Sequence, residues 1–422
     1  MKQRKDHLTL NTRRAHYRTP RALPVLVSLF LVLVLSMASV SQADSVTSTV
    51  NVGVSPEGIA LDTTNGYLYV ANYGSGTVSV IDGSTNIVVA NVTVGVYPIK
   101  VAFDPTNGYL YVANEGSGTV SVIDGSTNTV KTTVTVGANP EGVVFVPTNG
   151  YVYVANKGAA SVSVIDGSTN AVVTTVTVGS QPYAITFDSA NGDVYVTNSY
   201  SRSVSVIAAS SNAVVATVSV GIGPDGIAFD STNGYLYVAN YNSASVSVID
   251  GSTNTLVTTV TVGSDPEGIG FDPVNGYLYV ANYGSGTVSV IDGSANTVVS
   301  SVTVGTGPVW ATFDPKNGYL YVSNFGSNSV SVVTPSATTP TSTTTSSSTS
   351  KSSTASTTAA SSTTSKSSTA SQSSASTSTG GGGGIPEFPY QTAAVAALTL
   401  LLAASYLLVR RRSSLRRPQP TF

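Results

Sequence analysis

The residues of this chain that could carry out chemistry are carboxylates, supported by Tyr, Ser and Lys. The sequence has no cysteine, and its two histidines, His7 and His16, precede an apolar segment near the start. A body without His or Cys excludes Ser-His-Asp and Cys-His catalysis, imidazole general bases, and zinc, copper or haem held by these side chains. It also excludes a disulfide framework. We therefore expect no cofactor.

Several acids could still bind a metal ion through oxygen. Each flanks a proline that recurs along the chain, and calcium is the ion that suits such ligands. None of these segments has the ligand spacing of a dedicated calcium loop. We therefore predict no metal site and keep calcium as the weaker alternative. The acids concerned are Glu57, Glu141, Asp225, Asp265 and Glu267.

The middle of the chain repeats with a period of 42 residues. Tyr-Val-x-Asn, a proline and an Asn-Gly pair all keep this step, and three markers in one register indicate a true repeat. The Tyr-Val-x-Asn motifs start at Tyr69, Tyr111, Tyr153, Tyr195, Tyr237, Tyr279 and Tyr321. The prolines are Pro56, Pro98, Pro140, Pro182, Pro224, Pro266 and Pro308.

Each unit is expected to contain four short strands, because β-rich segments alternate with turns of Gly, Asn, Ser and Thr and no helical periodicity occurs. In the first unit we predict strands at 58–62, 67–72, 78–82 and 87–94. Four strands in about 40 residues are typical of a propeller blade. The sequence therefore predicts an all-β, seven-bladed β-propeller over residues 44–334.

The seventh unit has only three predicted strands, the last ending at Val333. The missing strand precedes the first unit, where residues 45–53 (SVTSTVNVG) match residues 87–95 (IVVANVTVG). We expect this segment to complete the last blade as its outer strand. A ring closed in this way leaves no unpaired inner edge.

Acids that recur at one position of every unit are better explained by structure than by chemistry. They open tight turns, where a carboxylate can accept hydrogen bonds from turn amides. The Asn of Tyr-Val-x-Asn is expected to hold the following loop. The turn acids are Asp82, Asp124, Asp166, Asp250 and Asp292, and Asp62, Asp104, Asp188, Asp230, Asp272 and Asp314.

Positions at which the units differ indicate a candidate binding site. Two loops per blade should share the face from which the chain enters each inner strand, and neighbouring blades place aromatic residues there. Exposed rings on loops favour recognition of sugars or proteins, and the alternative is that they pack on neighbouring loops. The binding hypothesis comprises Tyr73, Tyr241, Tyr283 and Phe325 as an arc, with Trp310, Glu57 and Lys100 at the channel mouth.

The two ends of the chain predict export and anchoring. Residues 1–43 form a basic and then apolar secretory signal, expected to be cleaved after Ala43, with an uncleaved anchor as the alternative. Residues 335–384, almost wholly Ser, Thr, Ala, Lys and Gly, predict a disordered stalk. Residues 390–409 suffice for a transmembrane helix of about 30 Å. The arginines that follow predict a cytoplasmic tail.

Charge is segregated along the chain. The formal net charge is −2, yet residues 44–334 contain 19 acids and five bases, a net charge of −14. Such a field repels polyphosphate, so we expect no nucleic-acid partner. Asn91, in Asn91-Val92-Thr93, is the only glycosylation sequon between residues 44 and 334.

The repeat resembles the YVTN family of β-propeller repeats found in archaeal surface-layer and bacterial envelope proteins. Tyr195-Val196-Thr197-Asn198 is the name motif, five units read YVAN and the last reads YVSN. The resemblance covers residues 45–334 and implies the propeller fold. It implies little about function, because one fold hosts many activities.

The C-terminal residues 385–422 resemble a second family, the PEF-type sorting signals of archaeal surface proteins. The resemblance rests on Pro386-Glu387-Phe388-Pro389, the apolar segment and the final arginines. It implies a membrane sorting enzyme (an archaeosortase) as a partner that processes the tail. A plain transmembrane anchor gives the same topology.

These observations favour a non-enzymatic cell-surface protein, exported and anchored in the cytoplasmic membrane by its C-terminus. Its loop face would act in recognition, adhesion or envelope structure, with an extracellular protein or glycan as partner. The alternative is a propeller enzyme of lactonase- or dehydrogenase-like type that uses carboxylates and a metal. The absence of His and the near-identical blades count against an enzyme. A lattice subunit without a discrete ligand is a third interpretation.

Overall fold

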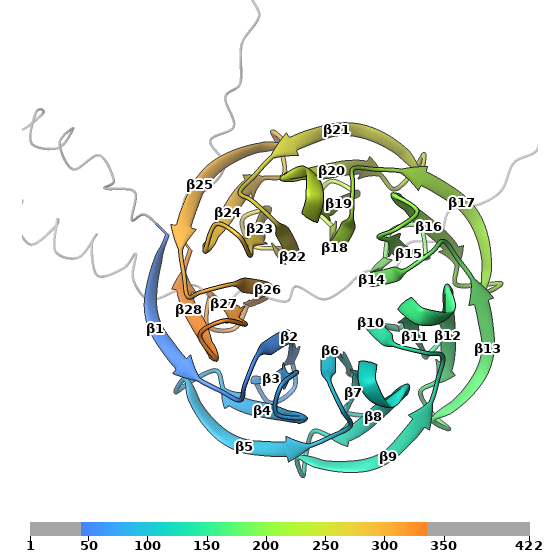
Figure 1. Ribbon diagram of the computed structural model, residues 1–422, viewed down its shortest axis with the longest axis vertical. Helices are drawn as coiled ribbons and strands as arrows, with labels where there is room; N and C mark the ends of the chain where they lie inside the picture. The colour runs from blue at the N-terminus through green and yellow to red at the C-terminus, as the bar shows by residue number, and fades with distance from the viewer. Residues whose placement is uncertain (1–43, 336–422) are drawn as a thin grey trace, which may run out of the picture. The chain divides into compact units, whose positions relative to one another are not determined.

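The computed structural model describes residues 44–335 as 28 strands in seven four-stranded sheets. The sheets are arranged as blades around a central axis (Figure 1). This confirms the predicted all-β, seven-bladed propeller. Within the described range, no helix is long and apolar enough to cross a membrane. The predicted signal, the stalk beyond residue 335, the transmembrane helix and the sorting signal lie outside the described residues.

Each of the first six blades is built from four consecutive antiparallel strands. Blades 1 to 3 contain β2 (Pro56–Asp62), β3 (Tyr67–Asn72), β4 (Thr77–Asp82), β5 (Ile87–Thr93), β6 (Pro98–Asp104), β7 (Tyr109–Asn114), β8 (Thr119–Asp124), β9 (Thr129–Thr135), β10 (Pro140–Val146), β11 (Tyr151–Asn156), β12 (Ser161–Asp166) and β13 (Ala171–Thr177). Blades 4 to 6 contain β14 (Pro182–Asp188), β15 (Asp193–Asn198), β16 (Ser203–Ala208), β17 (Ala213–Ser219), β18 (Pro224–Asp230), β19 (Tyr235–Asn240), β20 (Ser245–Asp250), β21 (Thr255–Thr261), β22 (Pro266–Asp272), β23 (Tyr277–Asn282), β24 (Thr287–Asp292) and β25 (Thr297–Thr303).

Blade 7 is closed by both ends of the described chain. It contains β26 (Pro308–Asp314), β27 (Tyr319–Asn324) and β28 (Ser329–Thr334), with β1 (Ser45–Asn51) on the outside (Figure 1). Strand β1 pairs antiparallel with β28, so that Val46 lies opposite Val333 and Val50 opposite Val330. The predicted closure is therefore confirmed. It buries Val50 in the cluster between blades 7 and 1.

The hydrophobic core lies between neighbouring blades. Between blades 1 and 2, for example, Val78 and Val80 pack with Leu110, Val112 and Ile123. Successive residues of each middle strand point to opposite faces of the blade, and both faces pack against a neighbouring blade, so these strands are buried almost throughout. Seven such clusters make one ring-shaped core, which holds the inner strands and their loops in place.

The motif tyrosine is fully buried and joins adjacent blades. The Tyr69 hydroxyl donates a hydrogen bond to the Gly125 carbonyl of the next blade at 3.2 Å and lies 2.7 Å from Asn128 Oδ1. Tyr321 makes the equivalent bonds across the closure, to Gly83 at 3.1 Å and Asn86 at 2.9 Å. The repeated tyrosine is thus a structural link.

The repeated acids and asparagines also have the structural roles predicted for them. Asp62 Oδ1 accepts a hydrogen bond from the Thr64 amide at 2.8 Å, and Asp82 Oδ1 accepts one from the Ser84 amide at 2.9 Å. Asn72 Nδ2 donates to Thr77 Oγ1 at 3.1 Å, across the loop that follows the motif. Because these side chains are used within the scaffold, they are poor candidates for catalysis.

Candidate functional site

Two loops per blade meet on one face of the propeller. In blade 1, the Tyr73 amide donates to the Ser55 carbonyl at 2.9 Å and the Gly74 amide to Val54 at 3.0 Å. The entering loop and the loop after the second strand are therefore tied together by hydrogen bonds, and they lie on the same face, as the sequence predicted. In blades 2, 3 and 5 the second loop contains a short 3-10 helix: η1 (Glu115–Ser117), η2 (Lys157–Ala159) and η3 (Tyr241–Ser243). We call this side the loop face.

A series of four aromatic rings crosses blades 6, 7, 1 and 2 on the loop face. The Tyr73 and Tyr97 rings are stacked, with centroids 4.5 Å apart and planes 12° apart. Phe325 lies 6.3 Å from Tyr73 and 6.5 Å from Tyr283, centroid to centroid. Tyr97 is exposed and the other three rings are partly exposed. Tyr241, also partly exposed, makes no ring contact with this series.

Tyr97 was not part of the binding hypothesis, although the repeat contains a signal for it. The equivalent residues of the other blades are small or polar: Ser55, Asn139, Gln181, Gly223, Asp265 and Gly307. All seven have a positive φ, 56° at Tyr97, a conformation that is uncommon for a bulky residue. A large ring at such a position indicates a requirement other than the turn itself.

The channel mouth brings Glu57, Lys100 and Trp310 together. Lys100 Nζ lies 3.4 Å from Glu57 Oε2 and 4.3 Å from the centroid of the Trp310 ring. Lys100 is buried and the Glu57 side chain is 13% exposed. Trp310 is partly buried and packs against the apolar cluster between blades 7 and 1. The three residues predicted for the mouth are therefore in contact, and the indole has a packing role as well.

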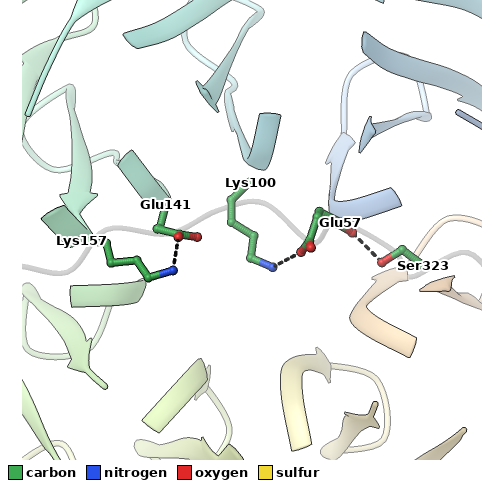
Figure 2. Close-up of polar contacts among 5 residues, drawn as sticks. All are labelled: Glu57, Lys100, Glu141, Lys157 and Ser323. Atoms are coloured by element: carbon green, nitrogen blue, oxygen red, sulfur yellow. Dashed lines mark hydrogen bonds and ion pairs between the residues drawn. The ribbon is translucent and has the colours of Figure 1, made fainter. Parts of the chain in front are cut away.

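A second cluster at the mouth joins blades 2 and 3. Lys157 Nζ lies 2.8 Å from Glu141 Oε1 and 3.9 Å from Glu115 Oε1. The same ammonium group lies 5.0 Å from the Tyr183 ring centroid. Glu141 is fully buried, and its Oε2 atom has no hydrogen-bond partner in the part of the chain that the structure describes. Figure 2 shows Lys157 directed towards Glu141 and Lys100 towards Glu57.

Burial dominates the acid–base properties of the mouth. It raises the pKa of Glu141 to about 8 against the opposing attraction of Lys157, and that of Asp225 to about 7 against Lys100. Burial also raises the pKa of Glu57, and burial together with Asp225 raises that of Glu267 well above its ordinary value. Burial therefore favours the protonated form of Glu141, in which its contact with Lys157 is a hydrogen bond to a neutral carboxyl group.

In blades 4 and 7, the alanine of the Tyr-Val-Ala-Asn motif is replaced by a residue with a hydroxyl group. Each hydroxyl group holds the backbone of one acid of the mouth. Thr197 Oγ1 donates to the Asp225 carbonyl of the next blade at 2.7 Å, and Ser323 Oγ donates to the Glu57 carbonyl at 2.5 Å (Figure 2). The five blades with alanine at this position have no hydroxyl to offer. The two exceptions therefore fix the backbone of Glu57 and Asp225, which sequence comparison of the blades alone did not suggest.

The acids of the calcium alternative do not form a ready-made site. Between residues 44 and 335, no three His, Cys, Asp or Glu side chains are grouped so that they could hold a metal ion. Glu57 and Glu141 each face a lysine ammonium group. A cation at Glu57, Glu141, Asp225 and Glu267 would have to compete with Lys100 and Lys157.

The fold and the comparisons with known proteins agree. A family model described as YNCE-like beta-propeller matches residues 43–232. This chain is a β-propeller repeat protein. Among solved structures, a chain of the Kuenenia stuttgartiensis hydrazine synthase matches the propeller with a TM-score of 0.61 and 21% identity, over 66% of this chain and 95% of that chain. No curated protein matches the sequence.

These similarities show the propeller fold and leave its function open. As many as 1450 solved chains match this one, so the fold is shared too widely to indicate an activity. At 21% identity, the hydrazine synthase chain shares the architecture alone. The function of the propeller must therefore be argued from its loop face.

Proposed function

We propose that the propeller is a non-enzymatic recognition protein that binds an extracellular glycan with its loop face. The observation that carries this proposal is the series of one exposed ring, Tyr97, and three partly exposed rings, Tyr73, Phe325 and Tyr283, on the same face as the mouth formed by Glu57, Lys100 and Trp310. Aromatic faces offer large contact area at low cost in conformational entropy, and sugar rings stack on them. At the mouth, the Glu57 carboxylate is 13% exposed and can accept a hydrogen bond from a sugar hydroxyl group.

The packing of the rings supports a preformed surface. Tyr73 touches both Tyr97 and Phe325, and Phe325 touches Tyr283, so each ring is held by a neighbour while part of it faces solvent. Burial and the nearby Glu115 raise the pKa of Tyr73, which keeps its hydroxyl protonated as a hydrogen-bond donor. Rings held in advance lose little freedom when a ligand binds.

The test is a glycan and protein array screen of the purified full chain, followed by calorimetry with the best ligand. Tyr283→Ala and Tyr97→Ala should weaken binding tenfold or more with little change in melting temperature. Tyr109→Ala is the matched control, because Tyr109 begins the second strand of blade 2 on the opposite face. Unchanged affinity with a lowered melting temperature would show that the rings are structural and would contradict the proposal.

We also propose that the chain is exported and held at the cell surface by its C-terminal segment. The proposal is supported by the signal-like start, the Ser- and Thr-rich residues 335–384 and the apolar residues 390–409. In that location Asn91 is accessible for glycosylation, since it is an exposed residue of outer strand β5. Protease added to intact cells should release the propeller by cutting within residues 335–384. A cytoplasmic, protected propeller would contradict it.

One observation favours a second function, that of an enzyme. Glu141 and Asp225 have a pKa of about 8 and about 7, and raised values of this kind are typical of general acids. Lactone and ester substrates should be assayed with and without added divalent cations. Turnover that is lost in Glu141→Gln, while the array shows no ligand, would favour the enzyme over the recognition protein.

A further inference from the structure

The loop of blade 4 after β15 differs from its six counterparts at three positions: Ser199 is small where the others have Tyr, Phe, Glu or Lys, and the next two differences are large side chains. Tyr200 occupies a position that is glycine in five other blades and Asn242 in blade 5. Arg202 occupies a position with positive φ in every blade, where the counterparts are Gly76, Gly118, Ala160, Ala244, Gly286 and Asn328. The φ of Arg202 is 52°, a conformation that long side chains rarely adopt. An observed departure of this kind is a reason to look for function.

Two of the three hydrogen bonds that anchor this loop are retained, and the two large residues project from it. The Ser199 amide donates to the Gln181 carbonyl at 2.8 Å, and Ser201 Oγ accepts a hydrogen bond from the Ser180 amide at 2.8 Å, as in other blades. In the other six blades, the backbone amide of the residue equivalent to Tyr200 donates a hydrogen bond to a carbonyl of the entering loop. This hydrogen bond is missing in blade 4. Tyr200 is 77% exposed, and its ring contacts no other aromatic ring within residues 44–335. The substitutions therefore reshape the surface without disturbing the blade.

A groove of about 480 Å³ lies at this point, between blades 4 and 5. Its lining combines one exposed ring, one guanidinium group and several polar side chains. Its volume is within the range of small-ligand sites. The lining residues are Gln181, Ser199, Tyr200, Arg202, Ile222, Gly223 and Asn242.

Arg202 is available for a ligand. It is the only arginine between residues 44 and 335, and it takes part in none of the ion pairs of that range. A guanidinium fork matches the geometry of a carboxylate and binds it through two parallel hydrogen bonds. A single cation in an acidic body is insufficient for polyphosphate, whose binding requires several phosphate contacts.

We propose that this groove binds one sugar residue that carries a carboxylate, that is, a single hexuronate within an otherwise neutral glycan. Tyr200 stacks on the sugar ring, Arg202 binds the carboxylate, and Gln181, Ser199 and Asn242 meet the hydroxyl groups. The inference extends the proposed glycan recognition, but it rests on residues separate from the aromatic series. The two sites can therefore fail independently.

The test is calorimetry of the purified full chain with galactose oligomers that carry one galacturonate residue (the galacturonate oligomers), the matched neutral galactose oligomers, and galactose oligomers that carry one sulfate instead. The galacturonate oligomers should bind, and Arg202→Gln should weaken their binding tenfold or more. Arg202→Lys, which keeps the charge but loses the fork, should also weaken binding. Tyr200→Ala should lower affinity as well. Lys316→Gln is the control for net charge, because Lys316 is exposed on the opposite face.

A second variant separates binding from folding. Arg202→Gly restores the residue of blades 1, 2 and 6, so it should raise the melting temperature slightly while abolishing binding of the galacturonate oligomers. No binding of these oligomers, equal binding of the neutral or sulfated ones, or binding unaffected by Arg202→Gln would each overturn the inference. If galacturonate does not bind while Tyr283→Ala weakens another glycan, the inference fails and the proposed function stands.

Discussion

Lys100 and Trp310 touch across a whole blade: the ammonium group of blade 2 lies 4.3 Å from the centroid of the indole ring of blade 7. Blade 1 stands between them, and it permits the contact because residue 58 is glycine. A Cβ atom at Gly58 would lie 2.8 Å from Lys100 Cδ and 2.8 Å from the Ile99 carbonyl oxygen. The asymmetry of the mouth therefore depends on a glycine in the intervening blade.

Gly58→Ala should lower the free energy of unfolding by about 1–3 kcal/mol, because the added methyl group overpacks a rigid backbone contact. It should also shift the fluorescence of Trp310, the only tryptophan of the chain, as Lys100 is displaced. Urea unfolding and the emission spectrum measure the two effects. Ala184→Gly, at the equivalent position of blade 4, should leave the spectrum unchanged. A Gly58→Ala protein with normal stability and emission would show that the mouth is looser than described.

Tyr237→Phe should lower the free energy of unfolding by about 1–2 kcal/mol, because it leaves the partners of a buried hydroxyl unsatisfied. Tyr237 bonds the Gly293 carbonyl at 3.1 Å and Asn296 Oδ1 at 2.7 Å. Tyr279→Phe is the matched control, since within residues 44–335 the Tyr279 hydroxyl has no hydrogen-bond partner in the next blade. Thermal unfolding should therefore separate the two variants. Equal losses would show that the ring, and not the hydroxyl group, supplies the link between blades.

The scaffold was predictable from sequence because the repeat supplies seven copies of the same local pattern. The predicted strands 67–72 and 87–94 correspond to β3 (Tyr67–Asn72) and β5 (Ile87–Thr93). The inner strand β2 begins two residues earlier than predicted, at Pro56, because Pro56 itself pairs with Asn72 before an irregularity in the register. Local turn chemistry and the closing strand thus determine nearly all of the architecture.

The site was less predictable because its contacts join loops of different blades. The sequence identified Tyr73, Phe325 and Tyr283 as neighbours, but not the stacking of Tyr97 on Tyr73. It also did not indicate that Lys157 would approach Glu141, since this depends on how far one loop reaches over the inner strand. Such contacts follow from the spacing and tilt of blades, which a pattern of residue types does not specify.

Removal of residues 1–52 should loosen blade 7. This deletion takes away β1 and exposes the edge of β28, together with the cluster that buries Val50 and Val330. Limited proteolysis should cut first in residues 308–334, and hydrogen exchange should quicken there while blades 3 and 4 stay protected. Val50→Ala, which keeps the strand, should lower stability without this local cleavage. A deletion variant as resistant as the full chain would contradict the closure.

The stability of the propeller should decrease as the pH rises from about 4.5 to 8. Glu141 has an ordinary pKa of 4.5 that burial raises to about 8 in the fold, and Asp225 rises from 3.8 to about 7. In this window the folded chain binds more protons than the unfolded chain, so the free energy of unfolding falls with increasing pH. Each full proton of difference contributes a slope of about 1.4 kcal/mol per pH unit.

Glu141→Gln should remove part of that slope, because glutamine stays neutral at every pH. Denaturant unfolding at pH 5, 6, 7 and 8 should therefore show a flatter profile for the variant, with its greatest relative gain at pH 8. The turn acid Asp82 has a lowered pKa, because Ser84 donates hydrogen bonds to it. The stability that Asp82 contributes is lost only as the pH falls below 3.8, the ordinary pKa of its carboxyl group. Asp82→Asn should therefore leave the slope between pH 5 and 8 intact. A wild-type profile that is flat over this range, or that rises with pH, would mean that Glu141 is ionised in the fold and paired with Lys157 as a true ion pair.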